Sequence, residues 1–292
     1  MFPCYSKISP TSRFVQALSE GLRQELDLTP KPGLVDRHNS GSHADLSYGL
    51  MSESINLLEG YFSECANALE SGCGIETLRD LGVETETRML RQFGTNTHRG
   101  AVFLGGLMLF GVHAASDFDA SQVSRAIASG ARQLFRNRLP METTGAKVRE
   151  KFQVGGIISE ALNGLPCVFE MGVPALQTGL EQGMSLRNAQ LLAMALLMQQ
   201  VEDTTALRRC GPLGLARLQE DGRFLERLLL EGKSPNSFLI MANRRYQARR
   251  LTMGGVADIL GMSIAWHCCG LPDLHSTATE KIEARIQASS SF

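Results

Sequence analysis

Apolar residues recur along most of this chain with the spacing of one helical face. In the first such segment they occupy Phe14, Leu18, Leu22 and Leu26, every fourth position, and side chains four residues apart lie on the same side of a helix. The spacing predicts a helix that ends where Pro30 begins a loop. No segment shows the strict alternation of apolar and polar residues that is typical of a strand. The pattern therefore predicts an all-α fold.

The same pattern predicts further helices separated by glycine, proline and polar residues. We expect a second helix that Asp45 caps and that ends near Gly72 and Gly74. The remaining helices are predicted over residues 75–93, 101–115, 120–135, 155–164, 186–198, 215–220, 224–230 and 259–269, with one more that begins at Pro235. Breaks are predicted at residues 210–214 and 253–258, a polar loop at 139–145, and loosely ordered ends at 1–11 and 274–292. No repeat or linker divides the chain, so the sequence predicts a single helical domain over residues 1–292, a multi-helix bundle with functional loops at one end.

Composition and charge narrow the class of protein. The chain has 292 residues, of which 43% are hydrophobic, and a formal net charge of −1; a protein so close to neutrality lacks the long-range field that attracts nucleic acid or an anionic membrane. The longest apolar run, residues 101–115, is too short to span a bilayer. The first residues lack the basic start and apolar core of an export signal, and the seven cysteines include no Cys-x-x-Cys pair. The composition thus predicts a cytoplasmic protein that binds neither nucleic acid nor membrane.

Residues 28–47 form the segment with the most unusual backbone and side chains. Pro30 and Pro32 hold the residues before them in extended conformations. Gly33 and Gly41 supply flexible corners, so no helix can run through the segment. Loops of this kind on a rigid scaffold commonly carry binding groups, although a polar connection between helices is the alternative interpretation. The ionisable residues of this loop are Lys31, Asp36, Arg37, His43 and Asp45.

A second irregular segment, residues 94–100, leads directly into the apolar run. Its threonine and asparagine side chains can cap the helix that follows, and the free N–H groups of a helix N-terminus attract anions. A cap without a ligand is the alternative interpretation. The residues of interest here are Thr95, Asn96, Thr97, His98, Arg99 and Gly100.

Carboxylates mark two further positions. Glu160 lies in a glycine-bounded helical segment, residues 155–164. Glu202 and Asp203 follow a nearly all-apolar helix, and Arg209 comes shortly after them. Carboxylates at the end of a buried helix are costly unless they are solvated, paired or bound to a cation. A solvated helix end is the alternative interpretation.

An arginine-rich helix face comes near the end of the chain. Arg244, Arg245, Arg249 and Arg250 fall on the helix that begins at Pro235. Such a face is usually solvated, and we assign it no function from the sequence. No Gly-x-Gly-x-x-Gly or Walker motif is present, so a nucleotide site in this chain would be of another kind.

Taken together, these segments match the motifs of one enzyme family in the family's own order. The matching segments are Thr29-Pro-Lys-Pro-Gly-Leu-Val-Asp-Arg37, then Asn39, Gly41 and His43-Ala-Asp45; Asn96-Thr-His-Arg-Gly100; Glu160-Ala161; Asp203-Thr204 with Arg209 and Gly211; and Gly254-Gly255 with Ala257-Asp258. An ordered set of this kind is far more specific than any one motif. On these residues the chain resembles the ATP:dephospho-CoA triphosphoribosyl transferase family.

The resemblance implies an all-α enzyme that acts on ATP and 3′-dephospho-CoA. C1′ of the ATP ribose would pass to a hydroxyl of the acceptor ribose, and free adenine would leave. The triphosphate would stay on the transferred sugar and would need cations, including Mg²⁺ held by one or two carboxylates and phosphate oxygens. The product would be 2′-(5″-triphosphoribosyl)-3′-dephospho-CoA, which a separate transferase would attach to the acyl carrier protein of citrate lyase or malonate decarboxylase.

The resemblance also suggests roles for individual residues. Cleavage of an N-glycosidic bond builds positive charge on the ribose, so the site needs carboxylates, a base for the incoming hydroxyl and a proton donor for adenine. The expected catalytic residues are Asp36, His43, Asp45, His98, Glu160 and Asp203, with His43 or His98 as proton donor and Asp36, Glu160 and Asp203 also as metal ligands. The expected substrate-binding residues are Lys31, Arg37 and Arg99 for phosphates, together with Asn96, Thr97, Gly100, Arg209, Gly254, Gly255 and Asp258.

The chain departs from the family pattern at three places. Ile158 stands where the family usually has arginine, Thr205 where asparagine is common, and residues 252–256 read Thr-Met-Gly-Gly-Val where Ser-Pro-Gly-Gly-Ser is usual. Loss of a phosphate-binding arginine would remove more than about 1 kcal/mol of charge-assisted hydrogen bonding. Two alternatives follow: a paralogue that acts on another nucleotide or phosphorylated pathway intermediate, and a catalytically silent nucleotide-binding protein.

Overall fold

The fold is built from α-helices joined by short connections. The computed structural model describes residues 9–115, 119–136 and 143–270, and within these ranges it contains no strand. The predicted all-α class is therefore confirmed. The helices are α1 (Pro10–Asp27), α2 (Tyr48–Glu70), α3 (Ile75–Phe93), α4 (Arg99–Ala114), α5 (Ala120–Phe135), α6 (Thr144–Phe152), α7 (Gly156–Leu162), the π-helical turn η1 (Val168–Gly172), α8 (Val173–Glu181), α9 (Leu186–Gln200), α10 (Thr204–Leu230), α11 (Asn236–Arg249) and α12 (Gly254–Cys269).

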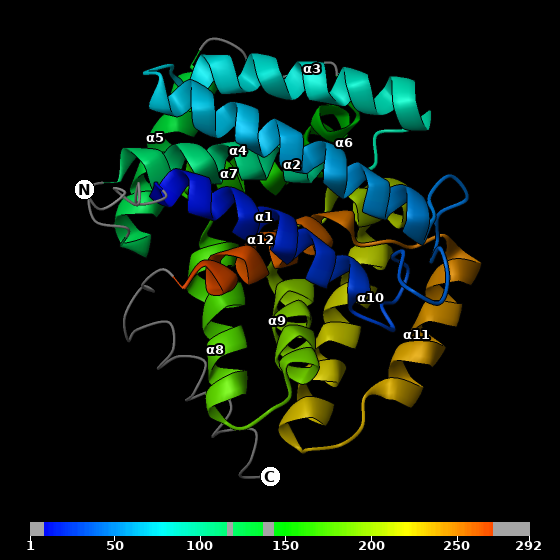
Figure 1. The fold of residues 1–292 in the computed structure, drawn as a ribbon. Helices are drawn as coiled ribbons and strands as arrows, with labels where there is room; N and C mark the ends of the chain where they lie inside the picture. The colour runs from blue at the N-terminus through cyan, green and yellow to red at the C-terminus, as the bar shows by residue number, and fades with distance from the viewer. Residues whose placement is uncertain (1–8, 116–118, 137–142, 271–292) are drawn as a thin grey trace.

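Helices α1 and α12 run through the middle of the molecule. Figure 1 shows them between α2 and α3 on one side and α8, α9 and α10 on the other. Helix α12 packs against α1, α4, α8, α9, α10 and η1. Its Trp266 is fully buried and meets the rings of Phe14 at 6.0 Å and Phe169 at 4.9 Å between centroids. The apolar sequence of α12 thus forms the centre of the core.

The contact between α1 and α12 requires small residues. A Cβ atom added at Gly21 of α1 would lie 2.4 Å from the carbonyl oxygen of Gly261 and 2.7 Å from Cβ of Ala265. Only a residue without a side chain allows the two backbones to approach this closely. The close packing fixes the end of α1, and with it the start of the loop of residues 28–47.

Two predicted helix starts are wrong. Helix α2 begins at Tyr48, and the hydroxyl of Ser47 accepts the N–H of Leu50, so Ser47 rather than Asp45 is its N-cap. Helix α12 begins at Gly254 rather than at residue 259, because the glycines predicted as a break adopt its first turn. The first error assigned the cap to a neighbouring polar residue, and the second counted the glycines of the first helical turn as a break.

Two other predictions are wrong over longer segments. The chain does kink at Gly211, which has φ 63° and ψ −165°, but the two short helices expected after it are one continuous stretch of α10. Residues 144 and 145 of the predicted polar loop belong to α6, which the apolar pattern did not reveal. The rest of that loop up to residue 142, and most of the predicted loose ends (residues 1–8 and 274–292), lie outside the described residues.

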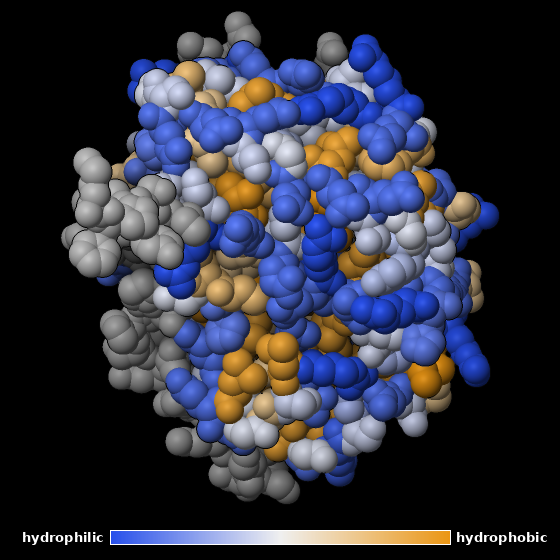
Figure 2. Space-filling view, viewed as in Figure 1, coloured by the Kyte–Doolittle hydropathy of each residue, from blue (hydrophilic) through white to orange (hydrophobic). Residues whose placement is uncertain are grey.

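The surface carries no broad apolar face in the view of Figure 2. Hydrophilic residues cover most of this side, and apolar residues gather in small separate patches. Within the described ranges, no helix combines the length and the apolar character needed to cross a membrane.

Candidate active site

The N-terminal ends of four helices meet at one end of the fold. Asp258, in the second turn of α12, accepts a hydrogen bond from the backbone N–H of Ala101 in α4. Asp203, the N-cap of α10, accepts one from Val256 of α12 at 3.0 Å. Glu202 Oε2 accepts the N–H of Gly156 at the start of α7 at 3.2 Å. The four ends are thus joined by carboxylates, which are favoured at helix N-termini.

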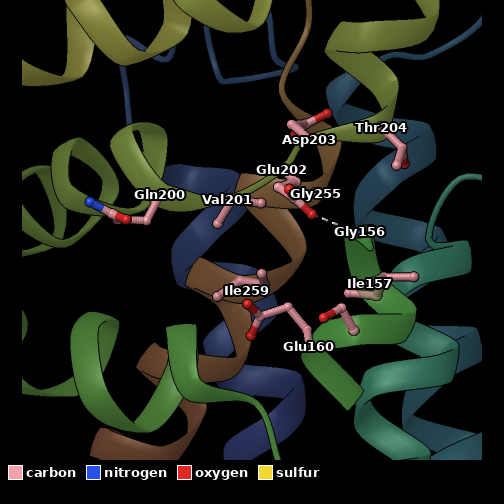
Figure 3. Close-up of a pocket in the computed structure, with 11 residues that line it drawn as sticks. Gly156, Ile157, Glu160, Gln200, Val201, Glu202, Asp203, Thr204, Gly255 and Ile259 are labelled. Atoms are coloured by element: carbon pink, nitrogen blue, oxygen red, sulfur yellow. Dashed lines mark hydrogen bonds between the residues drawn. The ribbon is translucent and has the colours of Figure 1, made fainter. Parts of the chain in front are cut away.

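A cavity of about 240 Å³ lies between the starts of α7, α10 and α12. Figure 3 shows Glu160 extending from α7 towards α12, while the Glu202 carboxylate reaches the start of α7. We call this space the acidic cavity. It is lined by Gly156, Ile157, Ser159, Glu160, Gln200, Val201, Glu202, Asp203, Thr204, Gly255 and Ile259.

Glu160 is the carboxylate best placed for proton transfer in the acidic cavity. One of its oxygens, Oε2, accepts the backbone N–H of Cys167 at 3.1 Å. Burial raises the pKa of Glu160, and the neighbouring carboxylates of Glu170 and Glu202 add to the increase. A raised pKa brings a carboxyl group closer to the range in which it can act as a general acid or base.

Asp203 joins α10 to α12. Its Oδ1 accepts the N–H groups of Thr205 at 2.8 Å and Ala206 at 2.9 Å, and Oδ2 accepts the N–H of Val256. A Cβ added at Gly255 would lie 3.1 Å from Oδ2. The carboxylate is only 1% exposed. Asp203 lines the acidic cavity, but its hydrogen bonds serve mainly to hold the two helix ends together.

Asp258 packs against the start of α4. A Cβ added at Gly100 would lie 1.8 Å from Asp258 Oδ2, so only glycine at position 100 admits the carboxyl group. Burial raises the pKa of Asp258 well above its ordinary value, and the carboxylates of Glu25 and Asp203 raise it further. Burial therefore favours the uncharged form of this carboxyl group.

Lys31 does not point into open space. It is 1% exposed, and its Nζ lies 2.6 Å from Glu25 Oε1 in a buried ion pair. The pair anchors the loop of residues 28–47 to the end of α1. Loss of either partner would leave an uncompensated buried charge, which is strongly destabilising.

Asp36 organises the loop around itself. Its Oδ2 accepts the N–H of Lys31 at 2.9 Å, and Oδ1 accepts the N–H groups of His38 at 2.8 Å and Asn39 at 3.0 Å. The side chain is 1% exposed. Both carboxylate oxygens of Asp36 thus accept hydrogen bonds from the backbone. The sequence predicted this carboxylate as a metal ligand or a base.

The other two cations expected to bind phosphates are also paired. Arg37 Nη2 lies 2.6 Å from Asp27 Oδ2, and Arg99 Nε lies 3.3 Å from Glu86 Oε2. Asn96 donates to the same oxygen of Glu86 at 3.0 Å. Both ion pairs are partly exposed, so each is worth little to stability.

The second half of the loop rests on α10 and on the segment before α12. His43 Nε2 lies 2.9 Å from the hydroxyl of Thr252, and its Nδ1 lies 3.3 Å from Nη2 of Arg209. Arg209 Nη1 donates to the carbonyl of Ser42 at 2.7 Å. Burial lowers the pKa of His43 to about 4, and the charge of Arg209 contributes. His43 is therefore neutral at pH 7.

The segment before α4 turns inward rather than capping the helix with its side chains. The N-cap of α4 is His98, and no side-chain hydrogen bond caps the helix, so the capping expected from Thr95, Asn96 and Thr97 is wrong. Thr95 donates to Asp45 instead, at 3.1 Å.

His98 itself faces the interior beneath α2. Its Nδ1 lies 2.8 Å from the hydroxyl of Ser54, and Thr97 contacts the same hydroxyl. Burial, together with the charge of Lys31, lowers the pKa of His98 to about 4. His98 is therefore neutral at pH 7, like His43.

The structure groups the expected residues into two sets. Around the acidic cavity or just beside it lie Glu160, Asp203, Gly254, Gly255, Asp258 and Gly100. The loop and the start of α4 hold Lys31, Asp36, Arg37, His43, Asp45, Asn96, Thr97, His98, Arg99 and Arg209, mostly in contacts with protein groups.

Sequence reasoning missed two residues of this end. Glu25 is the buried ion-pair partner of Lys31. The amphipathic pattern of α1 does not distinguish it from the other polar residues of that helix. Arg149 of α6 runs beside the cavity: its Cδ would lie 3.6 Å from a Cβ at Gly156. Burial lowers its pKa, and it forms no ion pair with any described residue. Arg149 could not be recognised from the sequence because its helix, α6, has no clear apolar face.

The expected Mg²⁺ ligands Asp36, Glu160 and Asp203 do not form one cluster. In the described ranges no group of three His, Cys, Asp or Glu side chains is arranged to hold a metal ion. Mg²⁺ bound with a nucleotide needs only one or two carboxylates beside the phosphate oxygens. Glu160 and Glu202, which both line the acidic cavity, meet that requirement, so the donor set fits an ion that enters with its substrate.

Similarity to known proteins extends over most of the chain. A model of the ATP:dephospho-CoA triphosphoribosyl transferase family matches residues 11–274. A relative from Stutzerimonas stutzeri, named probable 2-(5″-triphosphoribosyl)-3′-dephosphocoenzyme-A synthase, is 35% identical over 274 aligned positions, which cover 88% of this chain and 91% of the relative. Relatives of the same name are 35% identical in Pseudomonas putida, covering 87% and 94%, and 33% identical in Azotobacter vinelandii, covering 88% and 91%. No solved structure shows significant similarity to the chain.

The helical fold, the acidic cavity and these matches together define an all-α transferase. The chain belongs to the ATP:dephospho-CoA triphosphoribosyl transferase family, as the family match along most of its length and the 35% identical relatives show.

Proposed function

We propose that this protein transfers the 5-triphosphoribosyl group of ATP to 3′-dephospho-CoA and releases adenine. The observation that carries the proposal is the family match over residues 11–274. The acidic cavity supports it, because a transferring ribose develops positive charge that nearby carboxylates stabilise. Glu160, Glu202 and Asp203 all line this cavity.

The reaction exchanges one bond at C1′ for another. The bond from C1′ of the ATP ribose to N9 of adenine breaks, and both electrons leave with adenine. A bond forms between C1′ and the 2′ oxygen of the acceptor ribose, whose proton passes to a base. Adenine takes up one proton, so the transfer is neutral in protons.

The carboxyl groups of this end suit these steps better than the histidines. Glu160 faces the cavity and has a raised pKa, so its carboxylate serves as the base for the incoming hydroxyl. Burial raises the pKa of Asp258 and favours its protonated form, so we infer that Asp258 is the donor for departing adenine. His43 and His98 are neutral, with pKa values of about 4, so the proton-donor role expected for them has less support.

Mg²⁺ enters with the ATP triphosphate in this proposal. Glu202 is the residue that would hold it together with phosphate oxygens, which leaves Glu160 free to act as the base. When bound, the ion neutralises part of the triphosphate charge. In this proposal Asp36 and Asp203 do not bind the ion, and their side chains accept hydrogen bonds from backbone N–H groups.

A second candidate is a paralogue that acts on another nucleotide or phosphorylated intermediate. The observation that favours it is the apolar start of α7, where Ile157 lines the cavity and Ile158 is 9% exposed. An arginine at position 158 would bring a charge here that this chain lacks. The partly buried Arg149 beside Gly156 supplies a cation from another helix, and this favours the first candidate.

The product belongs, in this proposal, to prosthetic-group synthesis in the cytoplasm. A separate transferase would attach it to the acyl carrier protein of citrate lyase or malonate decarboxylase. Genes for subunits of one of these enzymes beside the gene for this protein would identify which system it serves.

The test is to incubate the purified protein with ATP, Mg²⁺ and 3′-dephospho-CoA and to follow products by chromatography and mass spectrometry. We expect free adenine in equal amount with a dephospho-CoA adduct that carries triphosphoribose. Adenine without that adduct, when another acceptor is supplied, would support the paralogue. Nucleotide binding without release of adenine under any condition would support a catalytically silent protein.

A further inference from the structure

The three cations expected to bind phosphates do not supply free positive charge to this end of the fold. Lys31, Arg37 and Arg99 each lie within 2.6 to 3.3 Å of a carboxylate oxygen. A phosphate chain that bound to them would have to displace those carboxylates. Free positive charge near the acidic cavity must therefore come from other cations.

Four arginines meet where α10 adjoins the C-terminal end of α11. The guanidinium group of Arg209 bonds the carbonyl of Arg250 at 3.4 Å, and the thiol of the next residue, Cys210, bonds the carbonyl of Arg249 at 3.2 Å. These contacts hold the end of α11 against residues 209 and 210. We call Arg208, Arg209, Arg249 and Arg250 the arginine cluster.

The arginine cluster concentrates positive charge without a matching carboxylate. None of its members lies within 4 Å of a carboxylate oxygen of a described residue, whereas Arg245 on the same helix pairs with Asp221 at 3.2 Å. Arg208, Arg249 and Arg250 are exposed. Like charges held together repel one another, so the fold gains nothing from this arrangement by itself.

The electrostatic surroundings of Arg209 agree with this geometry. Burial lowers its pKa, and the neighbouring charges of Arg208 and Arg250 lower it further, while Asp45 acts in the opposite direction. The Asp45 carboxylate is thus close enough to affect the pKa of Arg209, but it forms no ion pair with it. A polyanion placed here would relieve the repulsion.

One member of the cluster, Arg208, lies on the helix whose first residue lines the acidic cavity. Thr204, at the start of α10, lines the cavity, and Arg208 is four residues further along the same helix, so the two side chains share one face. Thr205 of the same turn accepts the N–H of Gly254 at the start of α12. A nucleotide whose ribose occupies the cavity can therefore extend its 5′ phosphates along α10 towards the arginines.

We propose that the arginine cluster binds the polyphosphate chain of a nucleotide substrate. The inference rests on the proposed function, because both substrates of that reaction carry such a chain, the triphosphate of ATP and the diphosphate of 3′-dephospho-CoA. Arg209 positions the cluster through the carbonyls of Ser42 and Arg250. Arg208, Arg249 and Arg250 make the phosphate contacts.

The test uses the full-length protein and a triple variant, Arg208→Gln with Arg249→Gln and Arg250→Gln. Arg209 is left unchanged because its hydrogen bonds hold the loop. The matched control is Arg223→Gln, which removes an exposed arginine from the far half of α10. Binding of inorganic tripolyphosphate is measured by calorimetry at two salt concentrations, and circular dichroism melting shows whether each variant is folded.

We expect the triple variant to bind tripolyphosphate about tenfold or more weakly than the wild type, with a smaller salt dependence, because several charge-assisted contacts are lost. The control should bind like the wild type. Steady-state kinetics then separate the two sources of the phosphate chain. A raised KM for ATP alone assigns the cluster to the triphosphate, and a raised KM for 3′-dephospho-CoA alone assigns it to the diphosphate.

Equal binding of tripolyphosphate and of both substrates by the wild type and a folded triple variant would overturn the proposal, as would absence of tripolyphosphate binding by the wild type. Failure of the proposed function has a different signature. In that case tripolyphosphate binding would still depend on the cluster, but no adenine would be released from ATP with 3′-dephospho-CoA.

Discussion

The loop of residues 28–47 and the junction of α10 with α11 are both rich in cations, but they use their charges differently. In the loop, Lys31 pairs with Glu25 and Arg37 with Asp27. At the junction, the arginine cluster has no carboxylate partner within 4 Å among the described residues, and Arg209 bonds to main-chain carbonyls. One set of cations builds the loop, and the other remains available to a ligand.

The difference shows why a charged motif alone does not locate a ligand. Motif residues can be needed to build the loop that frames a site, as the three backbone hydrogen bonds of Asp36 illustrate. Contacts with the ligand can then come from residues that belong to no motif. Replacing the cations of the loop should therefore mainly change stability, whereas replacing those of the arginine cluster should mainly change ligand binding.

The largest effect is expected from Lys31→Met. This change leaves Glu25 buried without its partner, which costs roughly 3–5 kcal/mol, and we expect the free energy of unfolding in urea to fall by that amount. The double variant Glu25→Gln with Lys31→Met removes both charges and should recover most of the loss. A single variant with unchanged stability and a raised KM for ATP would instead make Lys31 a phosphate ligand.

The next effect is expected from Glu160→Gln in the acidic cavity. Loss of a positioned acid–base group typically lowers kcat about 100-fold or more, and here KM for ATP and the melting temperature should change little. Glu181→Gln, which removes an exposed carboxylate from α8, is the matched control. Full turnover by Glu160→Gln would exclude Glu160 as the base.

A smaller effect concerns pH and His98. The folded pKa of His98 is lowered from 6.5 to about 4, so between these values the unfolded chain binds the extra proton. Stability should therefore be complete above pH 6.5 and fall as the pH drops towards 4, by up to about 1.4 kcal/mol per pH unit. Urea unfolding at several pH values measures the slope, and His98→Asn should make it shallower. An equal slope in the variant would assign the pH dependence to other groups.

The smallest effect is expected from Arg37→Gln and Arg99→Gln. Their ion pairs are partly exposed, so each change should cost less than about 1 kcal/mol of stability. If these arginines only build the loop and the start of α4, KM for both substrates should stay within about twofold of the wild type. A tenfold rise in KM with either variant would return the phosphate site to this region.

Much of the fold could be predicted from the sequence because periodicity reports burial directly. Residues 75–93 were predicted as a helix with the bounds that α3 has, and the kink near residue 211 was expected from its glycine and proline. Helix α6 could not be predicted, because its nine residues bury only Ala146 and Val148 and so show no clear apolar face.

The candidate site was only partly predictable for a related reason. The sequence pattern singled out Glu160 in a glycine-bounded helical segment and Asp203 at a helix end, and both line the acidic cavity. The formation of ion pairs depends on tertiary contacts, so the sequence could not show that Lys31 pairs with Glu25. Nor could it show that Arg208 and Arg250 come together from helices far apart in the chain.

The most direct test of this account is a crystal structure of the Glu160→Gln protein with ATP and 3′-dephospho-CoA bound. We expect the ATP ribose in the acidic cavity, with C1′ near residue 160 and a phosphate chain extending along α10 to Arg208 and Arg250. A ribose bound over the loop of residues 28–47, with its triphosphate on Lys31, Arg37 and Arg99, would contradict the account.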